Sequence, residues 1–272
     1  MIRNSAWLFL IAAAVLAGPL ADAAGGSQSL NDAVKWLEGE SHRLILASRR
    51  TMKDGAAAFP PQVGIGYEAF WLRDFAYTLE GSVDSYSDKE LLDASRLFIR
   101  SLRADGAGVD CVGFDGRLIY QPGGGSMGAN PVADGSQFTV AVAWHAYRKT
   151  HDLQFLKESI DALVKAMNAV PRNPETKLVH IKPGGVYWET CRAARDTYQN
   201  GGYWATPAGW FVYTLDRVDP ALADQTVLDL VADFRTGGAC EWMLGDKRQL
   251  PNYLASACLP LAGIRAMLEH RH

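Results

Sequence analysis

The sequence is poor in the residue patterns that hold metals or form a dense disulfide framework. It has only four cysteines in 272 residues, and none of them forms a C-x-x-C pair of the kind that binds zinc. Its six histidines show no ligand spacing either, so we expect them to be structural or surface residues. We therefore expect no metal site and no organic cofactor. The cysteines are Cys111, Cys191, Cys240 and Cys258, whose disulfide connectivity the sequence leaves open.

An excess of positive charge is also missing. The chain carries 27 basic and 30 acidic residues, for a net charge of −3. A protein that binds a phosphate backbone gains affinity from a basic surface, so this balance argues against nucleic acid as a partner. The glycine run 123–125 is not followed by the G-K-[ST] of a phosphate-binding loop, and no serine lies in a G-x-S-x-G elbow.

Long apolar runs are scarce, and the main one lies at residues 7–17. It is too short for the roughly 20 residues of a membrane-spanning helix. A basic residue precedes it, and an A-x-A pattern at residues 21–23 follows it. This arrangement is typical of a secretory signal peptide over residues 1–23, with an uncleaved anchor as the alternative. We expect the chain to be secreted or periplasmic, with no membrane contact after cleavage.

What the chain does have is the composition of a folded protein. Hydrophobic residues make up 48% and charged residues 21%, which excludes global disorder. The length allows one large domain or two small ones, and we expect a single domain over residues 24–272.

Apolar residues at helical spacing predict eight helices, mostly in antiparallel pairs. Ser87 and Glu90 form an S-x-x-E capping box at the start of one of them. No strand pattern is sustained, so the sequence favours an all-α fold. The predicted helices cover residues 30–52, 70–79, 87–102, 134–150, 152–170, 203–217, 220–234 and 253–270.

Four segments near the predicted helix ends combine carboxylates, Arg or Asn with aromatic rings. A sugar has a rim of hydroxyl groups and apolar C–H faces, so a sugar site needs this mixture. Each segment also has a simpler structural interpretation: an ion pair, a helix cap, a turn or a surface carboxylate. The candidate sugar-binding residues are Trp71, Arg73, Asp74, Asp134, Gln199, Asn200, Tyr203, Trp204 and Trp242, and Glu241 is the carboxylate beside Trp242 in the fourth segment.

Together these segments resemble the six-hairpin glycosidases, the (α/α)6-barrel superfamily that includes glucoamylase-, trehalase- and debranching-type enzymes. The W-x-R-D at residues 71–74 is similar to the first sugar-binding motif of the superfamily, and residues 198–204 resemble its N-G-x-x-W loop. The resemblance implies that Arg73 and Asp74 hold sugar hydroxyls and that Glu241 acts as the catalytic base. It also implies an α/α toroid of helical hairpins and a carbohydrate substrate.

The chain departs from that pattern in helix number. A complete barrel of this type has twelve helices, and the shortfall lies between residues 183 and 196, where many members carry the general acid. Either Glu189 replaces that acid or the acid is missing. We therefore expect an incomplete toroid that is a glycoside hydrolase, with a non-catalytic carbohydrate-binding relative as the second hypothesis. A structural α-hairpin protein with tryptophans in its core is the third.

An incomplete toroid has a further consequence for the surface. Helices that flank the gap would expose apolar sides that a full barrel covers. Large exposed apolar patches mark interfaces or unstable surfaces, so we expect a homo-oligomer or poor solubility.

Overall fold

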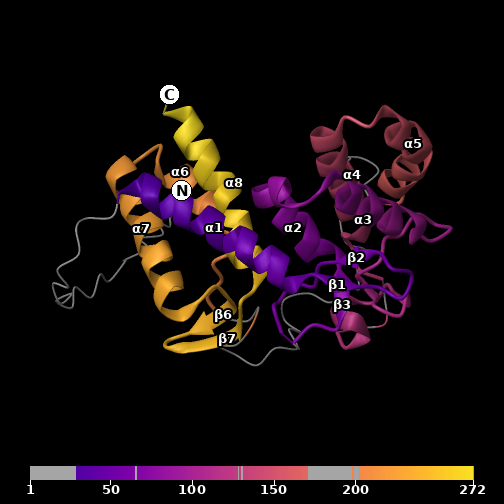
Figure 1. The fold of residues 1–272 in the computed structure, drawn as a ribbon, viewed down its shortest axis with the longest axis horizontal. Helices are drawn as coiled ribbons and strands as arrows, with labels where there is room; N and C mark the ends of the chain where they lie inside the picture. The colour runs from indigo at the N-terminus through magenta and orange to yellow at the C-terminus, as the bar shows by residue number, and fades with distance from the viewer. Residues whose placement is uncertain are drawn as a thin grey trace, which may run out of the picture.

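The computed structural model describes residues 29–64, 66–127, 129, 131–170, 198 and 202–271. The described part is mainly helical (Figure 1). Within it, no helix combines the length and apolarity needed to cross a membrane. The predicted signal peptide lies outside these residues. The helices are α1 (Leu30–Ser48), α2 (Leu72–Ser82), α3 (Asp88–Arg100), α4 (Gly135–Thr150), α5 (Leu153–Asn168), α6 (Ala208–Leu215), α7 (Pro220–Gly237) and α8 (Leu254–His270).

The described residues are mainly helical, in agreement with the fold class expected from the sequence, but they also contain a few short strands. Short strands pair into three small antiparallel sheets, ordered β1-β2, β3-β4-β5 and β6-β7. The predicted loop 236–252 contains the longest hairpin, in which Leu244 pairs with Lys247 around a Gly-Asp turn. Gly245 has a φ of +54°, which this kind of turn requires. The strands are β1 (Arg50–Thr51), β2 (Ala57–Ala58), β3 (Ala69–Trp71), β4 (Cys111–Gly113), β5 (Leu118–Ile119), β6 (Cys240–Leu244) and β7 (Lys247–Pro251).

Local capping signals set several helix starts where the sequence placed them. The Ser87 side chain accepts a hydrogen bond from the Glu90 backbone, and the Glu90 carboxylate accepts one from the Ser87 amide, which confirms the capping box. Two helices begin later than predicted. Residues 69–71 pair with β4 before α2 begins, and Tyr203 pairs with Met243 before α6 begins.

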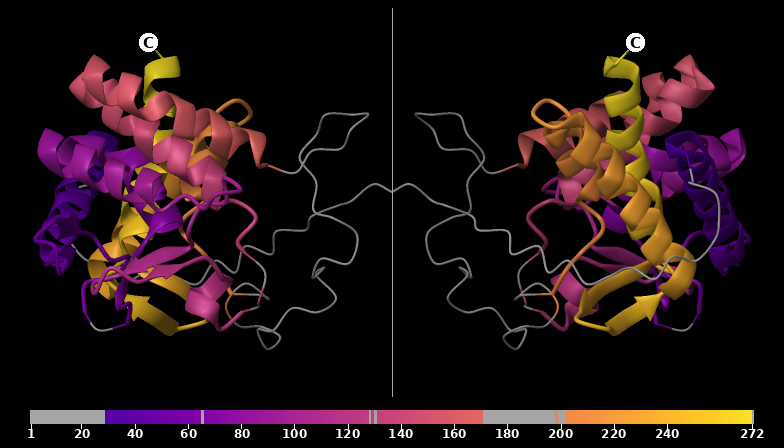
Figure 2. Two further views of the ribbon diagram at one scale, coloured as in Figure 1. Left: turned by 90° about the vertical axis from the view of Figure 1, so that its right-hand side faces the viewer. Right: turned by 90° about the vertical axis from the view of Figure 1, so that its left-hand side faces the viewer.

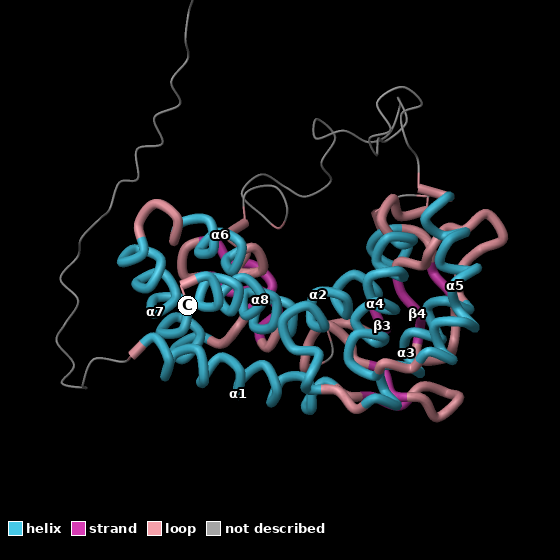
Figure 3. Tube along the Cα trace, turned by 90° about the horizontal axis from the view of Figure 1, so that it is seen from above, coloured by secondary structure: helices cyan, strands magenta, loops and turns pink. Residues whose placement is uncertain are grey.

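The helices form two curved rows. In the inner row α8 lies between α2 and α6, and α2 also packs on α4. In the outer part α7 packs on α1, and α3 packs on α5 (Figure 3). Helix α8 is buried over most of its length, as an apolar helix at the centre of a fold must be.

Two close helix contacts depend on glycine. A Cβ at Gly263 of α8 would lie 2.1 Å from the carbonyl oxygen of Gly209 in α6, so a side chain does not fit between these helices. A Cβ at Gly81 of α2 would similarly meet the carbonyl of Cys258 in α8 at 1.7 Å. These contacts hold α2, α8 and α6 close together in the inner row.

The strands gather at one end of the helices, as the side views show (Figure 2). Strand β3 runs directly into α2, and β7 is followed by α8. The loops and helix starts that carry the candidate site therefore lie together at this end.

Exposed apolar side chains occur on the two helix pairs at opposite ends of the rows. Trp144 on α4 is 55% exposed and Val164 on α5 is 51% exposed. On the other pair, Phe211 of α6 is 59% exposed and Leu222 of α7 is 50% exposed. The sequence predicts apolar exposure on the helices that flank residues 183–196, and a homo-oligomer formed through such faces stays a prediction.

Candidate functional site

Two carboxyl groups from distant parts of the chain each accept a hydrogen bond from a tyrosine. Both pairs lie at the end of the molecule where the strands gather. Tyr67, in the loop before β3, donates a 2.5 Å hydrogen bond to Oε1 of Glu241 in β6. Tyr253, the residue before α8, donates to Oδ1 of Asp74 in the first turn of α2. The rings of Tyr67 and Tyr253 lie 6.1 Å apart, so the two pairs are neighbours.

Burial controls the protonation of both carboxyl groups. Glu241 is only 2% exposed, and this burial raises its pKa to about 7, opposed by the Tyr67 hydrogen bond and supported by the charge of Asp74. Burial likewise raises the pKa of Asp74 to about 6, although Tyr253 and Arg73 act in the opposite direction. The site therefore has two carboxyl groups that change charge close to neutral pH.

Arg73 supplies positive charge beside Asp74. Its Nη2 atom donates to Asp134, with N–O distances of 2.9 and 2.7 Å to the two carboxylate oxygens. Burial alone would lower the pKa of Arg73, but Asp134 and Asp74 raise it above its usual range. Its Nε atom is buried and has no partner among the described residues. The sequence predicted Arg73, Asp74 and Asp134 in one site, and the structure brings these three together.

Asp110 belongs to the same cluster, although it is not among the site residues predicted from the sequence. It is 7% exposed, and its Oδ2 atom accepts a 3.2 Å hydrogen bond from the amide of Gly124. Burial raises its pKa, and the charges of Arg73 and Asp134 also act on it. Asp110 is the residue before β4, and only the pairing of β4 with β3 brings it beside α2. An aspartate before a short strand carries no local signal of such a role.

A glycine loop and a tryptophan lie beside the carboxyl groups. Gly123 and Gly124 each have a φ of +65°, a backbone conformation that favours glycine. A Cβ on Gly124 would lie 3.8 Å from the Trp71 ring, so the loop reaches that ring. The Trp71 ring also meets Tyr67 edge-on at 5.4 Å, and its buried Nε1 atom has no partner among the described residues.

Other aromatic candidates lie around Tyr198. The Tyr198 ring is 5.1 Å from that of Trp204 and 6.5 Å from that of Trp242. Burial raises the pKa of Tyr198, as do the charges of Glu241 and Asp74, which shows that it lies near both carboxyl groups. Tyr203 is 68% exposed and lines a different pocket with Trp204.

The remaining candidates fall outside the described residues. These are Glu189, Gln199 and Asn200. Within the described part of the chain, no cluster of His, Cys, Asp or Glu has the arrangement of a metal site. The described cysteines, Cys111, Cys240 and Cys258, are buried free thiols.

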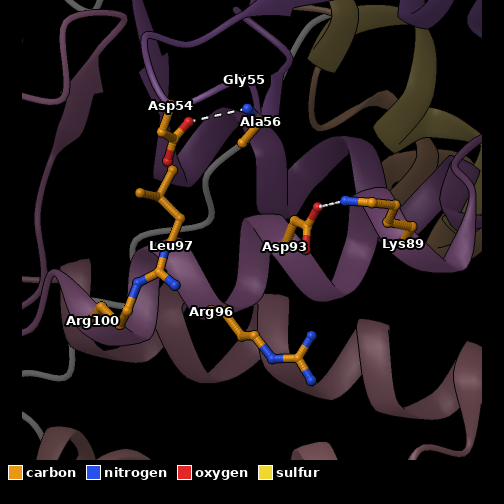
Figure 4. A pocket seen from close by; sticks show the side chains of 8 residues that line it. All are labelled: Asp54, Gly55, Ala56, Lys89, Asp93, Arg96, Leu97 and Arg100. Atoms are coloured by element: carbon orange, nitrogen blue, oxygen red, sulfur yellow. Dashed lines mark hydrogen bonds and ion pairs between the residues drawn. The ribbon is translucent and has the colours of Figure 1, made fainter.

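A separate pocket of about 310 Å³ lies between the β1–β2 turn and α3 (Figure 4). In its lining Lys89 pairs with Asp93, and Asp54 accepts a hydrogen bond from the amide of Ala56 at 3.0 Å. It includes none of the candidate site residues.

Comparisons with known proteins give only distant structural similarity. No protein-family profile and no curated protein matches the sequence. A solved structure of a glycosidase variant covers 82% of this chain at 19% identity, with a TM-score of 0.39. A glycosidase variant in complex with glucose covers 88% of the chain at 19% identity and a TM-score of 0.39, and a wild-type glycosidase gives 0.37. The chain spans 63% of the length of the first of these proteins.

Proposed function

We propose that this protein is a glycoside hydrolase that acts on an oligo- or polysaccharide by acid/base catalysis. The observation that carries the proposal is the pair of tyrosine-bonded carboxyl groups, Asp74 and Glu241, which titrate near pH 6 and pH 7. Glycoside hydrolysis needs a carboxylate that can take up a proton near the working pH, and Glu241, with its pKa raised to about 7, meets this need. Trp71 and Arg73 beside them supply an apolar ring face and a donor for sugar hydroxyl groups.

In the proposed reaction Glu241 is the general base. Its ionised carboxylate takes a proton from a water molecule, whose oxygen then attacks the anomeric carbon. A second carboxyl group protonates the glycosidic oxygen, which leaves with the departing sugar. We assign this acid role to Glu189, and assign Arg73, Asp74 and Asp134 to holding the sugar ring. If the enzyme inverts, the two catalytic carboxyl groups stand about 6.5–9.5 Å apart.

The test is hydrolysis of a panel of aryl glycosides and oligosaccharides by the full chain and by Glu241→Gln. Loss of the base should reduce turnover by about 10²–10⁴-fold while sugar binding survives. Glu68→Gln is the matched control, because Glu68 is an exposed carboxylate in the same segment as Tyr67. If the unmutated protein binds sugars but hydrolyses none of them, it is the non-catalytic carbohydrate-binding relative instead.

Glu189→Gln tests the acid separately. The loss should be large for substrates with poor leaving groups and small for nitrophenyl glycosides, whose leaving group needs little protonation. Equal losses for both substrate classes would remove Glu189 from the mechanism.

We further propose that the fold is an incomplete α/α toroid. The succession α4, α2, α8 and α6 in the inner row, with helices packed outside it, supports this arrangement. An experimental structure in which the helix pairs do not continue around one axis would overturn it.

We also propose that residues 1–23 direct export of the chain. Export predicts that protein recovered outside the cytoplasm begins after Ala23, so an intact Met1 there would contradict cleavage.

We propose in addition that the exposed apolar faces of α4–α5 and α6–α7 form a homo-oligomer. The oligomer predicts that light scattering at high concentration gives a mass above that of one chain. A monomer that binds no hydrophobic dye would contradict it.

A further inference from the structure

A second pocket lies beside β6, the strand that carries Glu241, and Glu241 is not among its described lining residues. It has a volume of about 340 Å³ and is lined by residues of β6 and α7, of the segment before α6 and of the start of α6. Cys240 and Met243 of β6 line it, whereas Glu241 between them bonds to Tyr67. The pocket is therefore separate from the candidate catalytic cluster and is large enough for a small organic molecule.

Aromatic and apolar groups form most of the pocket. Trp204, Phe234 and Met243 provide apolar surface, and the exposed ring of Tyr203 stands at the edge. The Tyr198 ring contacts Trp204 edge-on. A Cys and a Met among the rings add soft, polarisable surface.

The charged groups in the lining are carboxylates. Asp229 and Asp233 lie on the pocket side of α7, and no Lys, Arg or His is among the described lining residues. Both oxygens of Asp233 accept hydrogen bonds from Arg248, so its charge is balanced. Asp229 forms no ion pair in the described part of the chain; its Oδ1 atom accepts a 2.7 Å hydrogen bond from the Gln225 amide.

The hydrogen-bond donors of the lining are largely in use. The indole N–H of Trp204 donates to the Tyr198 carbonyl at 3.1 Å, and the Thr226 hydroxyl donates to the Leu222 carbonyl at 2.7 Å. The backbone amides of Tyr203 and Met243 bond to each other's carbonyl oxygens. An anionic ligand would therefore meet carboxylates and few free donors.

We infer that this pocket binds a small organic cation with an apolar body, such as a methylated ammonium group. Aromatic faces attract a cation through the negative charge of their π-systems, and a carboxylate at the edge adds a direct charge contact. An apolar body fills the space among Trp204, Phe234 and Met243. The inference does not depend on the proposed hydrolase activity.

The test compares two probes of nearly equal shape, choline and the neutral 3,3-dimethylbutan-1-ol, on the full chain. Binding is followed through the NMR signal of the Met243 methyl group, identified by its loss in Met243→Leu. We expect choline to shift this signal and to bind about tenfold more tightly than the neutral probe. Equal affinity for the two probes, or no shift of the Met243 signal by choline, would overturn the inference.

Three variants separate charge from shape. Asp229→Asn should weaken choline binding about tenfold and leave the neutral probe unchanged. Tyr203→Ala removes a ring that is mostly in solvent, so it should weaken choline binding without unfolding the chain. Asp161→Asn is the matched control, since it removes an exposed carboxylate from α5, outside the pocket. If it weakens choline binding as much as Asp229→Asn does, the effect is one of net charge and the pocket is not the site.

Discussion

Tyr67 donates a hydrogen bond of 2.5 Å to Glu241, which lies 174 residues further along the chain. The bond fixes the orientation of a buried carboxyl group and stabilises its ionised form. It therefore opposes the burial that raises the Glu241 pKa to about 7.

Replacing Tyr67 with Phe removes this bond and leaves the ring. The pKa of Glu241 should then rise further, by roughly one to two units, because a hydrogen bond to a charged group contributes about 1.5–3 kcal/mol. A base with a higher pKa is less ionised, so hydrolysis near neutral pH should fall while the rate at alkaline pH recovers. The measurement is the pH profile of kcat for Tyr67→Phe, with Tyr213→Phe on the exposed side of α6 as control. An unshifted acidic limb would contradict the assigned role of Tyr67.

Replacing Glu241 with Gln should increase stability, with an effect that depends on pH. The folded pKa of about 7 lies above the ordinary value of 4.5, so the folded chain binds this proton more tightly than the unfolded chain. The wild type should therefore lose stability between pH 4.5 and pH 7 and carry the full penalty above pH 7. Gln cannot ionise, so the variant should gain about 3 kcal/mol relative to wild type between pH 4 and pH 8.

Urea unfolding of both proteins at pH 4 and pH 8 measures this change. Glu68→Gln is the control, since that carboxylate is exposed. A stability difference between Glu241→Gln and wild type that is the same at both pH values would show that Glu241 is not protonated preferentially in the folded state.

Replacing Arg73 with Ala should weaken sugar binding by about ten- to a hundredfold. The guanidinium group can donate charge-assisted hydrogen bonds, each of about 1.5–3 kcal/mol, to sugar hydroxyl groups. Its partner Asp134 holds the guanidinium group in place. Calorimetric titration with oligosaccharides gives the affinity, and Arg43→Ala on α1 is the control, because Arg43 pairs only with Glu40 of its own helix among the described residues. Unchanged affinity in Arg73→Ala would remove Arg73 from the sugar site.

Replacing Gly263 with Ala should separate α8 from α6. The added Cβ would meet the backbone of Gly209, which cannot move without displacing its helix, so we expect a loss of about 1–3 kcal/mol. Gly39→Ala on α1 is the opposite case, because nothing lies within 4 Å of its added Cβ, and it should stabilise the chain by about 0.5–1 kcal/mol. Thermal unfolding of the two variants distinguishes them. A stable Gly263→Ala would mean that the two helices do not pack at this distance.

The sequence determined features that depend on neighbours along the chain. The Ser87–Glu90 capping box and the start of α7 at Pro220 were predictable, because a cap or a proline acts within one helical turn. Arg73, Asp74 and Asp134 were predicted as candidates, since two are adjacent and all three lie at helix starts.

Only the tertiary structure decided which side chains share the site. Short strands such as β3 are stabilised by partners far along the chain, so their own residues gave no strand pattern. The pairing of β3 with β4 brings Asp110 beside Arg73, and the packing of α8 against α2 brings Tyr253 to Asp74. The shifted pKa values of Asp74 and Glu241 follow from the same packing, because burial, which no local residue pattern specifies, is their largest cause.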